Sequence, residues 1–334
     1  MGKLVDTVAD PAIPTLARAL DPAELAKELS LLAFPQVDAS QGLHLRVIQW
    51  TRASRCTFEV ALRTASGWQE LIGKVYAEDR SDIYQAMEEI RRAGFDAEDE
   101  FAIPRPVAFL APLHLLLYEK VPGTRARALI VNPNASDRVL AVERCARWLA
   151  RFQARAPRSG RAFRLHDYLI SLEAWWRRFL DLALPFANKA RRLFEQLNAA
   201  APGLNSTEMC AGHGDYTCAQ VLLVQGRTVT IDWDTFNAAD PSRDVARFLV
   251  DLKRMGLKYH GSMHAFDWAA EVFLKTYAAT GHSYVPTHLA FQEAAICLER
   301  AKSDVDKQDR GCCERAEAML DEGLRILDRG TCHC

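Results

Sequence analysis

The side chains best suited to chemistry lie between His213 and Asp244, a stretch in which carboxylates and one amide recur around a short turn. In chain order its three segments are His213-Gly214-Asp215-Tyr216-Thr217-Cys218-Ala219-Gln220, Ile231-Asp232-Trp233-Asp234 and Asp240-Pro241-Ser242-Arg243-Asp244. A positioned carboxylate can take a proton from a hydroxyl group, and carboxylate and amide oxygens are ligands that Mg²⁺ accepts. The stretch therefore has the residue types for metal-assisted chemistry on a hydroxyl group.

A hairpin is expected between the first two segments, and it determines which side chains can meet. Two short apolar runs flank a glycine turn: Val221–Val224, Gln225-Gly226-Arg227 and Thr228–Ile231. If the loop has two residues, Gln220 falls opposite Ile231, where paired residues lie about 4.5–5.5 Å apart. We therefore expect Gln220 and Asp232 to converge at the open end of the hairpin, with Asp215 one loop away.

Oxygen ligands of this kind suit a hard cation that also binds phosphate. Mg²⁺ is usually held by one or two protein groups, while phosphates and water complete its ligand shell. Gln220 and Asp232 are therefore expected to hold the metal of a metal–nucleotide complex, which leaves Asp215 for a hydroxyl nucleophile. The alternative is a hairpin with solvated acids at its base, which any one of these acids fits equally well.

The order and spacing of these residues resemble the aminoglycoside phosphotransferase and choline kinase-like family, small-molecule relatives of the protein kinases. The resemblance covers residues 43–252 and is sharpest from His213 onward. It implies that Asp215 is the catalytic base and that Gln220 and Asp232 bind metal, with Asp232 bridging metal and phosphates. It also implies that Asp244 braces the catalytic loop by accepting its backbone amides, and that His213 packs and hydrogen-bonds to shape that loop.

Two positions depart from the pattern of related kinases. Gln220 stands where the family usually has asparagine, and it offers the same carbonyl oxygen on a side chain one methylene longer. Metal coordination and a weaker second-metal site are both open for this residue. Asp234 stands where protein kinases have glycine, although an acid at this place is similar to many small-molecule kinases.

Lys74 is the candidate phosphate-binding cation, in the expected strand Glu70–Tyr76. Its neighbours are apolar, so its charge is costly there unless it meets a partner, and the resemblance implies a phosphate-holding lysine in this strand. The alternative is an edge-strand lysine that faces water. The resemblance also implies a glutamate partner on the next helix, where Glu88 and Glu89 are candidates and Glu89 points less far from the apolar face.

Further nucleotide contacts are expected from two loops. No GxGxxG segment occurs, so the turn at residues 50–55 would meet phosphate through backbone amides, Ser54 or an arginine. The resemblance implies that adenine hydrogen-bonds to the backbone of Glu119 and Val121, next to the hinge at Pro122-Gly123. ATP and Mg²⁺ are the cofactors that follow, with GTP as an open alternative.

The elements that must position these residues change type along the chain. A helix capped by Asp21 is expected to precede three antiparallel strands, a helix and another strand. Those five segments are His44–Ile48, Thr57–Leu62, Glu70–Tyr76, Ile83–Ile90 and Leu113–Tyr118. The rest is mostly helical. With the resemblance, the fold class is α+β, a protein-kinase-like two-lobed fold with a small antiparallel β lobe and a larger helical lobe.

The length of 334 residues allows two packed lobes. We expect a helical leader at residues 1–42 and a mostly β, nucleotide-binding lobe at residues 43–120. Residues 121–334 then form the lobe with the catalytic loop and the substrate-binding helices.

Composition excludes several classes of partner. Lys plus Arg number 42 and Asp plus Glu 43, so no overall basic field attracts nucleic acid or anionic lipid. Prolines interrupt the longest apolar stretch, residues 101–117, which therefore cannot span a bilayer as a helix. Acids at Asp6 and Asp10 and an odd count of nine cysteines favour a cytoplasmic protein with reduced thiols. The expected partner is a small hydroxylated molecule, with no nucleic acid and no membrane, and the sequence does not indicate the oligomeric state.

Two functional hypotheses follow. The first is an ATP- and Mg²⁺-dependent phosphotransferase that moves the γ-phosphate to a hydroxyl of an aminoglycoside-, amino-sugar- or choline-like molecule. Residues 260–334 hold 8 Lys or Arg and 12 Asp or Glu, which slightly favours a cationic acceptor. The alternative is a non-catalytic, pseudokinase-type regulatory protein that binds nucleotide, which Gln220 favours. A protein substrate is disfavoured because no Ala-Pro-Glu segment follows Asp232.

Overall fold

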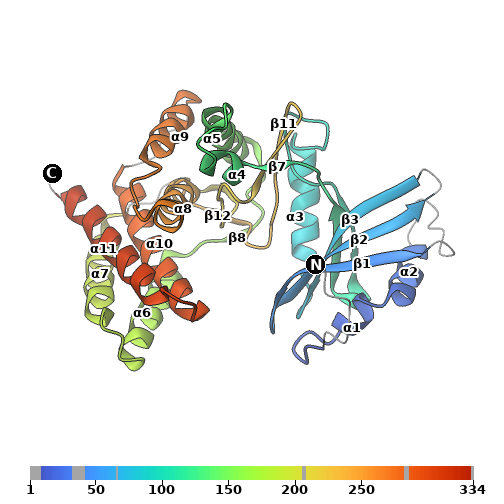
Figure 1. The fold of residues 1–334 in the computed structure, drawn as a ribbon, viewed down its shortest axis with the longest axis horizontal. Coiled ribbons are helices and arrows are strands. Elements are labelled where there is room, and N and C mark those ends of the chain that lie inside the picture. The colour runs from blue at the N-terminus through green and yellow to red at the C-terminus, as the bar shows by residue number, and fades with distance from the viewer. Residues whose placement is uncertain (1–8, 32–41, 65–66, 205–207, 282–285, 332–334) are drawn as a thin grey trace. The chain divides into compact units, whose positions relative to one another are not determined.

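The computed structural model describes residues 9–31, 42–64, 67–204, 208–281 and 286–331 (Figure 1). The chain forms two compact units, Met1–Gly123 with Val229–Trp233, and Thr124–Thr228 with Asp234–Cys334. None of the described helices is both long enough and apolar enough to cross a membrane. The expected boundaries after residues 42 and 120 stay a prediction.

A five-stranded antiparallel sheet in the order β1-β2-β3-β6-β5 forms the first unit. Its strands are β1 (Leu43–Thr51), β2 (Arg55–Thr64), β3 (Gly67–Tyr76), β5 (Pro106–Leu110) and β6 (Leu115–Glu119). The unit also has the two-residue strand β4 (Phe101–Ala102). All four predicted strands are confirmed. The strand β6 begins two residues later than predicted, because Ala111–Leu113 form a 3₁₀ helix.

One face of this sheet packs in an apolar cluster, and the other face carries Lys74. One face carries the fully buried Phe58 and packs with the leader helices α1 (Leu16–Ala19) and α2 (Pro22–Ser30) in one apolar cluster. Gly73 lies opposite Phe58 in the register, and a Cβ on Gly73 would lie 2.7 Å from that ring, so a larger residue there would have to displace the ring. The next residue, Lys74, points to the opposite face because side chains alternate along a strand.

The predicted start of the leader helix is confirmed. The Asp21 side chain accepts hydrogen bonds from the amides of Ala23 at 2.8 Å and Glu24 at 3.3 Å, and α2 begins at Pro22. Leu25 and Leu29 are fully buried, as their helical spacing indicates. Leu32, expected on the same face, lies outside the described residues. The second predicted helix is α3 (Ser81–Arg92), which buries Ile83, Met87 and Ile90 and packs against β5.

The second unit is mostly helical, as predicted for the chain beyond the hinge. Its helices are α4 (Ala126–Val131), α5 (Arg138–Arg155), α6 (Leu165–Asp181), α7 (Ala187–Ala200), α8 (Ser242–His260), α9 (Asp267–Ala279), α10 (Pro286–Lys307) and α11 (Cys312–Thr331). A 3₁₀ helix, Ala201–Gly203, follows α7. Helix α10 packs against both α8 and α11 (Figure 1).

Short strands support the predicted catalytic loop. The strands β8 (Arg161–Ala162), β12 (Asn237–Ala239) and β9 (Cys210–Gly212) form a small sheet in that order. The loop follows β9 directly, and β12 is two residues before α8. The catalytic loop and the start of α8 are thus both fixed to one small sheet.

The predicted hairpin is present as β10 (Val221–Val224) and β11 (Arg227–Thr230). Gln225-Gly226 form its two-residue turn, and Gly226 has φ +75°, which suits glycine. β10 also pairs with β7 (Thr124–Arg125). The boundary between the units falls inside β11, so Gln220 belongs to the second unit and Asp232 to the first. Their expected convergence stays a prediction.

Candidate active site

Lys74 and Asp232 form an ion pair within the first unit. Lys74 lies on β3, between β2 and β6, and is 5% exposed. Its Nζ donates a hydrogen bond to Oδ1 of Asp232 over 2.5 Å. Asp232 has φ +74°, a left-handed backbone conformation that is uncommon outside glycine and that recurs at functional sites. The edge-strand alternative for Lys74 is therefore wrong, since the strand is central and the ammonium group has a carboxylate partner.

Of the two glutamates considered as partners of Lys74, Glu88 bonds within its own helix. Its carboxylate lies 3.2 Å from Arg91 and 2.9 Å from Arg92, one turn further along α3. This engagement leaves Glu89 as the candidate for the position that the family resemblance implies. The contact between Glu89 and Lys74 stays a prediction.

The chemistry of the donors near Lys74 fits Mg²⁺. The Asp232 side chain is 27% exposed, so a cation can approach its carboxylate, which is a hard oxygen donor. Within the described ranges, no group of three or more His, Cys, Asp or Glu is arranged to hold a metal by itself. Mg²⁺ is usually bound through one or two carboxylates, and phosphates and water are its other ligands. Asp232 fits this role, and the half-buried Gln220 has the right donor oxygen, but both assignments stay predictions.

The turn between β1 and β2 binds a carboxylate from the leader. The amide of Ala53 and the indole of Trp50 donate to Oδ2 of Asp10 over 2.8 and 3.2 Å. The Ala53 hydrogen bond is the main reason why the pKa of Asp10 lies below its ordinary value. This turn therefore presents a backbone amide to an anionic oxygen. Ser54 is exposed in the same turn, and its contact with phosphate stays a prediction.

The hinge segment is fixed by backbone hydrogen bonds on both sides. The amide of Glu119 donates to the carbonyl of Arg105 over 2.9 Å, and that of Lys120 donates to the carbonyl of Glu70 over 3.2 Å. Glu119 must therefore use its carbonyl for the expected contact with adenine. That contact and the one expected of Val121 stay predictions.

Asp244 holds the predicted catalytic loop in the second unit. It lies in the first turn of α8 and is 2% exposed. Its Oδ2 accepts from the amide of His213 over 2.6 Å, and its Oδ1 accepts from the amide of Gly214 over 3.0 Å. Hydrogen bonds to an ionised carboxylate are among the stronger ones in proteins. The bracing contact that the family resemblance implies for Asp244 is therefore confirmed.

Gly214 and His213 determine the path of this loop. Gly214 has φ +83°, and a Cβ there would lie 2.2 Å from the carbonyl oxygen of Thr235, so no other residue fits. His213 is fully buried, its Nδ1 accepts from the Asp215 amide over 3.3 Å, and its ring packs edge-on against Tyr216. These contacts match the loop-shaping role that the resemblance implies for His213.

Two arginines flank the Asp215 carboxylate. Arg300 on α10 donates to its Oδ1 over 2.8 Å, and Nε of Arg247 on α8 lies 3.7 Å from the same oxygen. The Asp215 side chain is nevertheless 37% exposed. The carboxylate is therefore oriented by fixed charges and still accessible to a small molecule.

Glu299 in turn holds Arg247. The guanidinium of Arg247 donates to both Glu299 oxygens over 2.7 and 2.9 Å, and the Tyr168 hydroxyl donates to Glu299 over 3.0 Å. Burial alone would raise the pKa of Glu299, but Arg247 outweighs it and lowers the pKa to about 2. Sequence reasoning missed Arg247, Glu299 and Arg300. The position of Arg247, three residues after Asp244, was the one available signal, because the two α10 residues lie in no motif.

Comparison with known proteins places this geometry in context. The sequence model of the phosphotransferase enzyme family matches residues 51–290. No curated protein sequence matches the chain. The solved structures that resemble it include a choline/ethanolamine kinase family protein from Mesorhizobium loti, with 14% identity over 92% of this chain and 97% of that chain and a TM-score of 0.59.

Two further solved structures contain nucleotides. Amicoumacin kinase hAmiN, in complex with AMP-PNP, Ca²⁺ and Ami, is 15% identical over 95% of this chain and 96% of that chain, with a TM-score of 0.62. A mutant of aminoglycoside phosphotransferase APH(4)-Ia, in a ternary complex with ADP and hygromycin B, is 15% identical over 85% and 94%, with a TM-score of 0.59. At these identities the likeness establishes the fold alone, and it confirms the predicted kinase-like α+β class.

Proposed function

Because the chain belongs to the phosphotransferase enzyme family, we propose that it transfers the γ-phosphate of ATP, with Mg²⁺, to a hydroxyl group of a small molecule. The ion pair between Lys74 and Asp232 is the observation that carries this proposal. MgATP requires a cation that binds phosphate and a carboxylate that binds Mg²⁺. The ion pair brings one of each together, although Lys74 and Asp232 are 158 residues apart in the sequence.

In the proposed reaction, Lys74 neutralises phosphate oxygens of the bound nucleotide. Its ammonium group is buried in the sheet and is already oriented by Asp232, so little side-chain freedom is lost on binding. Asp232 and Gln220 are the residues that would hold Mg²⁺. When bound, the metal would neutralise charge that develops on the phosphates.

Asp215 is the proposed catalytic base. Its carboxylate accepts the proton of the acceptor hydroxyl while that oxygen forms a bond to the γ-phosphorus. The bond between the γ-phosphorus and the bridging oxygen breaks, and ADP leaves. Asp244 and Gly214 support this role because they hold the loop in one conformation, and a positioned base contributes more than a mobile one.

Membership of the family does not by itself name the molecule that accepts the phosphate. Structures of similar fold contain hygromycin B or amicoumacin beside a nucleotide, which supports a small-molecule acceptor for this chain as well. The aminoglycoside-, amino-sugar- or choline-like acceptors expected from the sequence are therefore part of the assay described next.

The proposal is tested by transfer of labelled γ-phosphate from ATP to a panel of hydroxylated small molecules, with and without Mg²⁺. We expect Mg²⁺-dependent product, and we expect the Asp232→Ala variant to lose Mg²⁺-dependent ATP binding in calorimetric titration. The Asp181→Ala variant, altered at an exposed acid at the end of α6, is the control. Equal Mg-ATP binding by Asp232→Ala and the parent would contradict the metal assignment, and no transfer to any acceptor would contradict the activity.

A further inference from the structure

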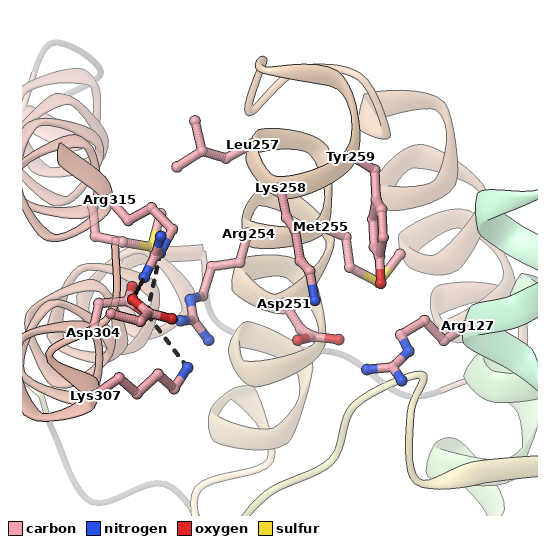
Figure 2. A pocket seen from close by; sticks show the side chains of 12 residues that line it. Arg127, Asp251, Arg254, Met255, Leu257, Lys258, Tyr259, Asp304, Lys307 and Arg315 are labelled. Carbon is pink, nitrogen blue, oxygen red and sulfur yellow. Dashed lines mark hydrogen bonds and ion pairs between the residues drawn. The ribbon is translucent and has the colours of Figure 1, made fainter. Parts of the chain in front are cut away.

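A basic pocket lies in the second unit beside α8, α10 and α11 (Figure 2). Its volume is about 290 Å³, enough for a small metabolite. Five basic side chains line it: Arg127, Arg254, Lys258, Lys307 and Arg315. Its three carboxylates are those of Asp251, Asp304 and Asp309. The basic groups are in excess, which is the opposite of what a cationic ligand requires.

Two of the three carboxylates are already neutralised by the pocket's own cations. Asp304 is 1% exposed and pairs with Arg254, with Lys307 at 3.5 Å and with Arg315 at 3.8 Å. Figure 2 shows these three cations converging on Asp304. Asp309 pairs with Arg315 as well. These acids therefore hold the wall of the pocket together and add little negative charge to its interior.

The other cations face the remaining carboxylate, Asp251. Figure 2 shows the Lys258 ammonium group above Asp251 and the Arg127 guanidinium to its right. Across the described residues, neither cation has an ion pair with an acid, although Lys258 lies over the Tyr259 ring. Burial raises the pKa of Asp251, and the Cys218 thiol donates to its carboxylate over 3.4 Å. Two cations therefore stand beside one carboxylate, so the net charge in this part of the pocket is positive.

Helix α8 carries side chains of the pocket and also the Arg247 that contacts Asp215. Arg247, Asp251, Arg254 and Lys258 recur every three or four residues and therefore share that face. Arg247 contacts Asp215, and Asp251 follows one turn later, about 6 Å along the helix axis. The charge of Asp215 also affects the pKa of Asp251. The pocket and the site of Asp215 therefore neighbour each other along one helix.

We propose that this pocket binds an anionic group, a phosphate or a carboxylate, of the molecule whose hydroxyl is phosphorylated at Asp215. The proposal rests on the proposed function and narrows its acceptor. The acidic excess of residues 260–334 does not oppose it, because cations from outside that segment pair with those acids. Arg247 pairs with Glu299, Arg254 with Asp304, Lys253 with Glu322 and Lys189 with Glu317.

Anion binding is tested without nucleotide, so that the result does not depend on catalysis. The full chain is titrated in a calorimeter with inorganic phosphate, with glycerol 3-phosphate, with gluconate and with glycerol as the uncharged reference. We expect the anions to bind and glycerol not to bind. The phosphate and gluconate titrations distinguish a phosphate site from a carboxylate site.

Charge variants assign the binding to this pocket. Arg127→Gln and Lys258→Gln should each weaken anion binding about fivefold, the upper range for one solvated charged contact. Asp251→Asn should strengthen it, which a merely structural role of Asp251 would not do. Lys275→Gln, at an exposed position of α9 outside the pocket, should leave it unchanged. No anion binding by the parent, or equal binding by Lys258→Gln and the parent, overturns the proposal.

Transfer assays separate this proposal from the proposed function. We expect hydroxylated anions to be phosphorylated, with the KM for the acceptor raised about fivefold in Lys258→Gln and the KM for ATP unchanged. Phosphorylation of choline or an amino sugar, with the same acceptor KM in Lys258→Gln and the parent, overturns the anionic acceptor and leaves the phosphotransferase intact. Anion binding without transfer to any acceptor overturns both the acceptor role of the pocket and the proposed function, whereas the anion site itself stands.

Discussion

Arg300 on α10 donates a hydrogen bond to the Asp215 carboxylate over 2.8 Å, across a separation of 85 residues in the sequence. Arg247 approaches the same oxygen from α8. A carboxylate that acts as a base must be held in one orientation and must still be reached by its substrate. The two arginines provide the first condition, and the 37% exposure of the Asp215 side chain provides the second.

Removal of the carboxylate tests its role directly. Asp215→Ala should lower kcat by about 10²–10⁴-fold, the range for loss of a positioned base, and should leave Mg-ATP binding unchanged. Transfer rates and calorimetric titration of the same preparations check both effects. Asp181→Ala again serves as the control, and unchanged turnover in Asp215→Ala would remove this residue from the mechanism.

Arg300 is expected to act through Asp215, as a positioning residue. Arg300→Gln should lower kcat about tenfold, because the carboxylate loses a charge-assisted hydrogen bond, while the KM for ATP stays constant. Arg300→Lys, which keeps the charge, should recover part of the rate. Arg192→Gln, at an exposed site on α7, controls for the loss of a surface arginine. If Arg300→Gln raised the KM for ATP and left kcat intact, the positioning role would be wrong.

Gln220 distinguishes an active kinase from a non-catalytic relative. If its amide oxygen reaches the metal, Gln220→Ala should weaken Mg²⁺ dependence and rate, whereas Gln220→Asn should keep much of the activity because the same carbonyl oxygen is retained. Nucleotide affinity of the three proteins is measured across a series of Mg²⁺ concentrations. If Gln220→Ala had the nucleotide affinity of the parent at every Mg²⁺ concentration and Gln220→Asn had a higher affinity, the non-catalytic alternative would be favoured.

The sequence predicted the features that depend on residues close together in the chain, and it missed those that depend on contacts between distant residues. The strands β1 to β3, the β10–β11 turn and the cap of α2 follow from local patterns, and all are present. The bracing by Asp244 followed from the family resemblance. Local patterns could not place β6 beside β3, and so the edge-strand alternative for Lys74 was wrong. Arg300 and Asp10 reach their partners through tertiary packing, which no motif encodes.

Asp244 links the stability of the second unit to the catalytic loop. In Asp244→Ala, the amides of His213 and Gly214 lose a buried acceptor, and each unsatisfied group costs about 1–3 kcal/mol. We expect a lower melting temperature and a strong loss of activity. Asp244→Asn should be nearly as harmful, because its NH₂ group cannot accept from an amide. A variant with parental stability would contradict the bracing role.

Glu293 on α10 predicts a pH dependence of stability. It faces Lys253 of α8 and also Glu322 and Arg325 of α11, and Glu322 pairs with Lys253 over 2.9 Å. Burial raises the pKa of Glu293 from 4.5 to about 7, the charge of Lys253 opposes this rise, and that of Glu322 adds to it. Since Glu322 binds both neighbouring cations, little positive charge is left to stabilise a second carboxylate.

The raised pKa of Glu293 in the folded chain determines whether the free energy of unfolding rises or falls with pH. Below pH 4.5 the group is protonated in both states, and its contribution to stability is fully present. As the pH rises toward about 7, the unfolded chain releases the proton more readily, so the free energy of unfolding falls by up to about 1.4 kcal/mol per pH unit.

Glu293→Gln removes this titration. The variant should match the parent near pH 5 and exceed it by about 2 kcal/mol at pH 8, measured by denaturant unfolding. Glu271→Gln, at an exposed site on α9, should follow the parent, and parallel curves for Glu293→Gln and the parent would show that Glu293 does not titrate in this range.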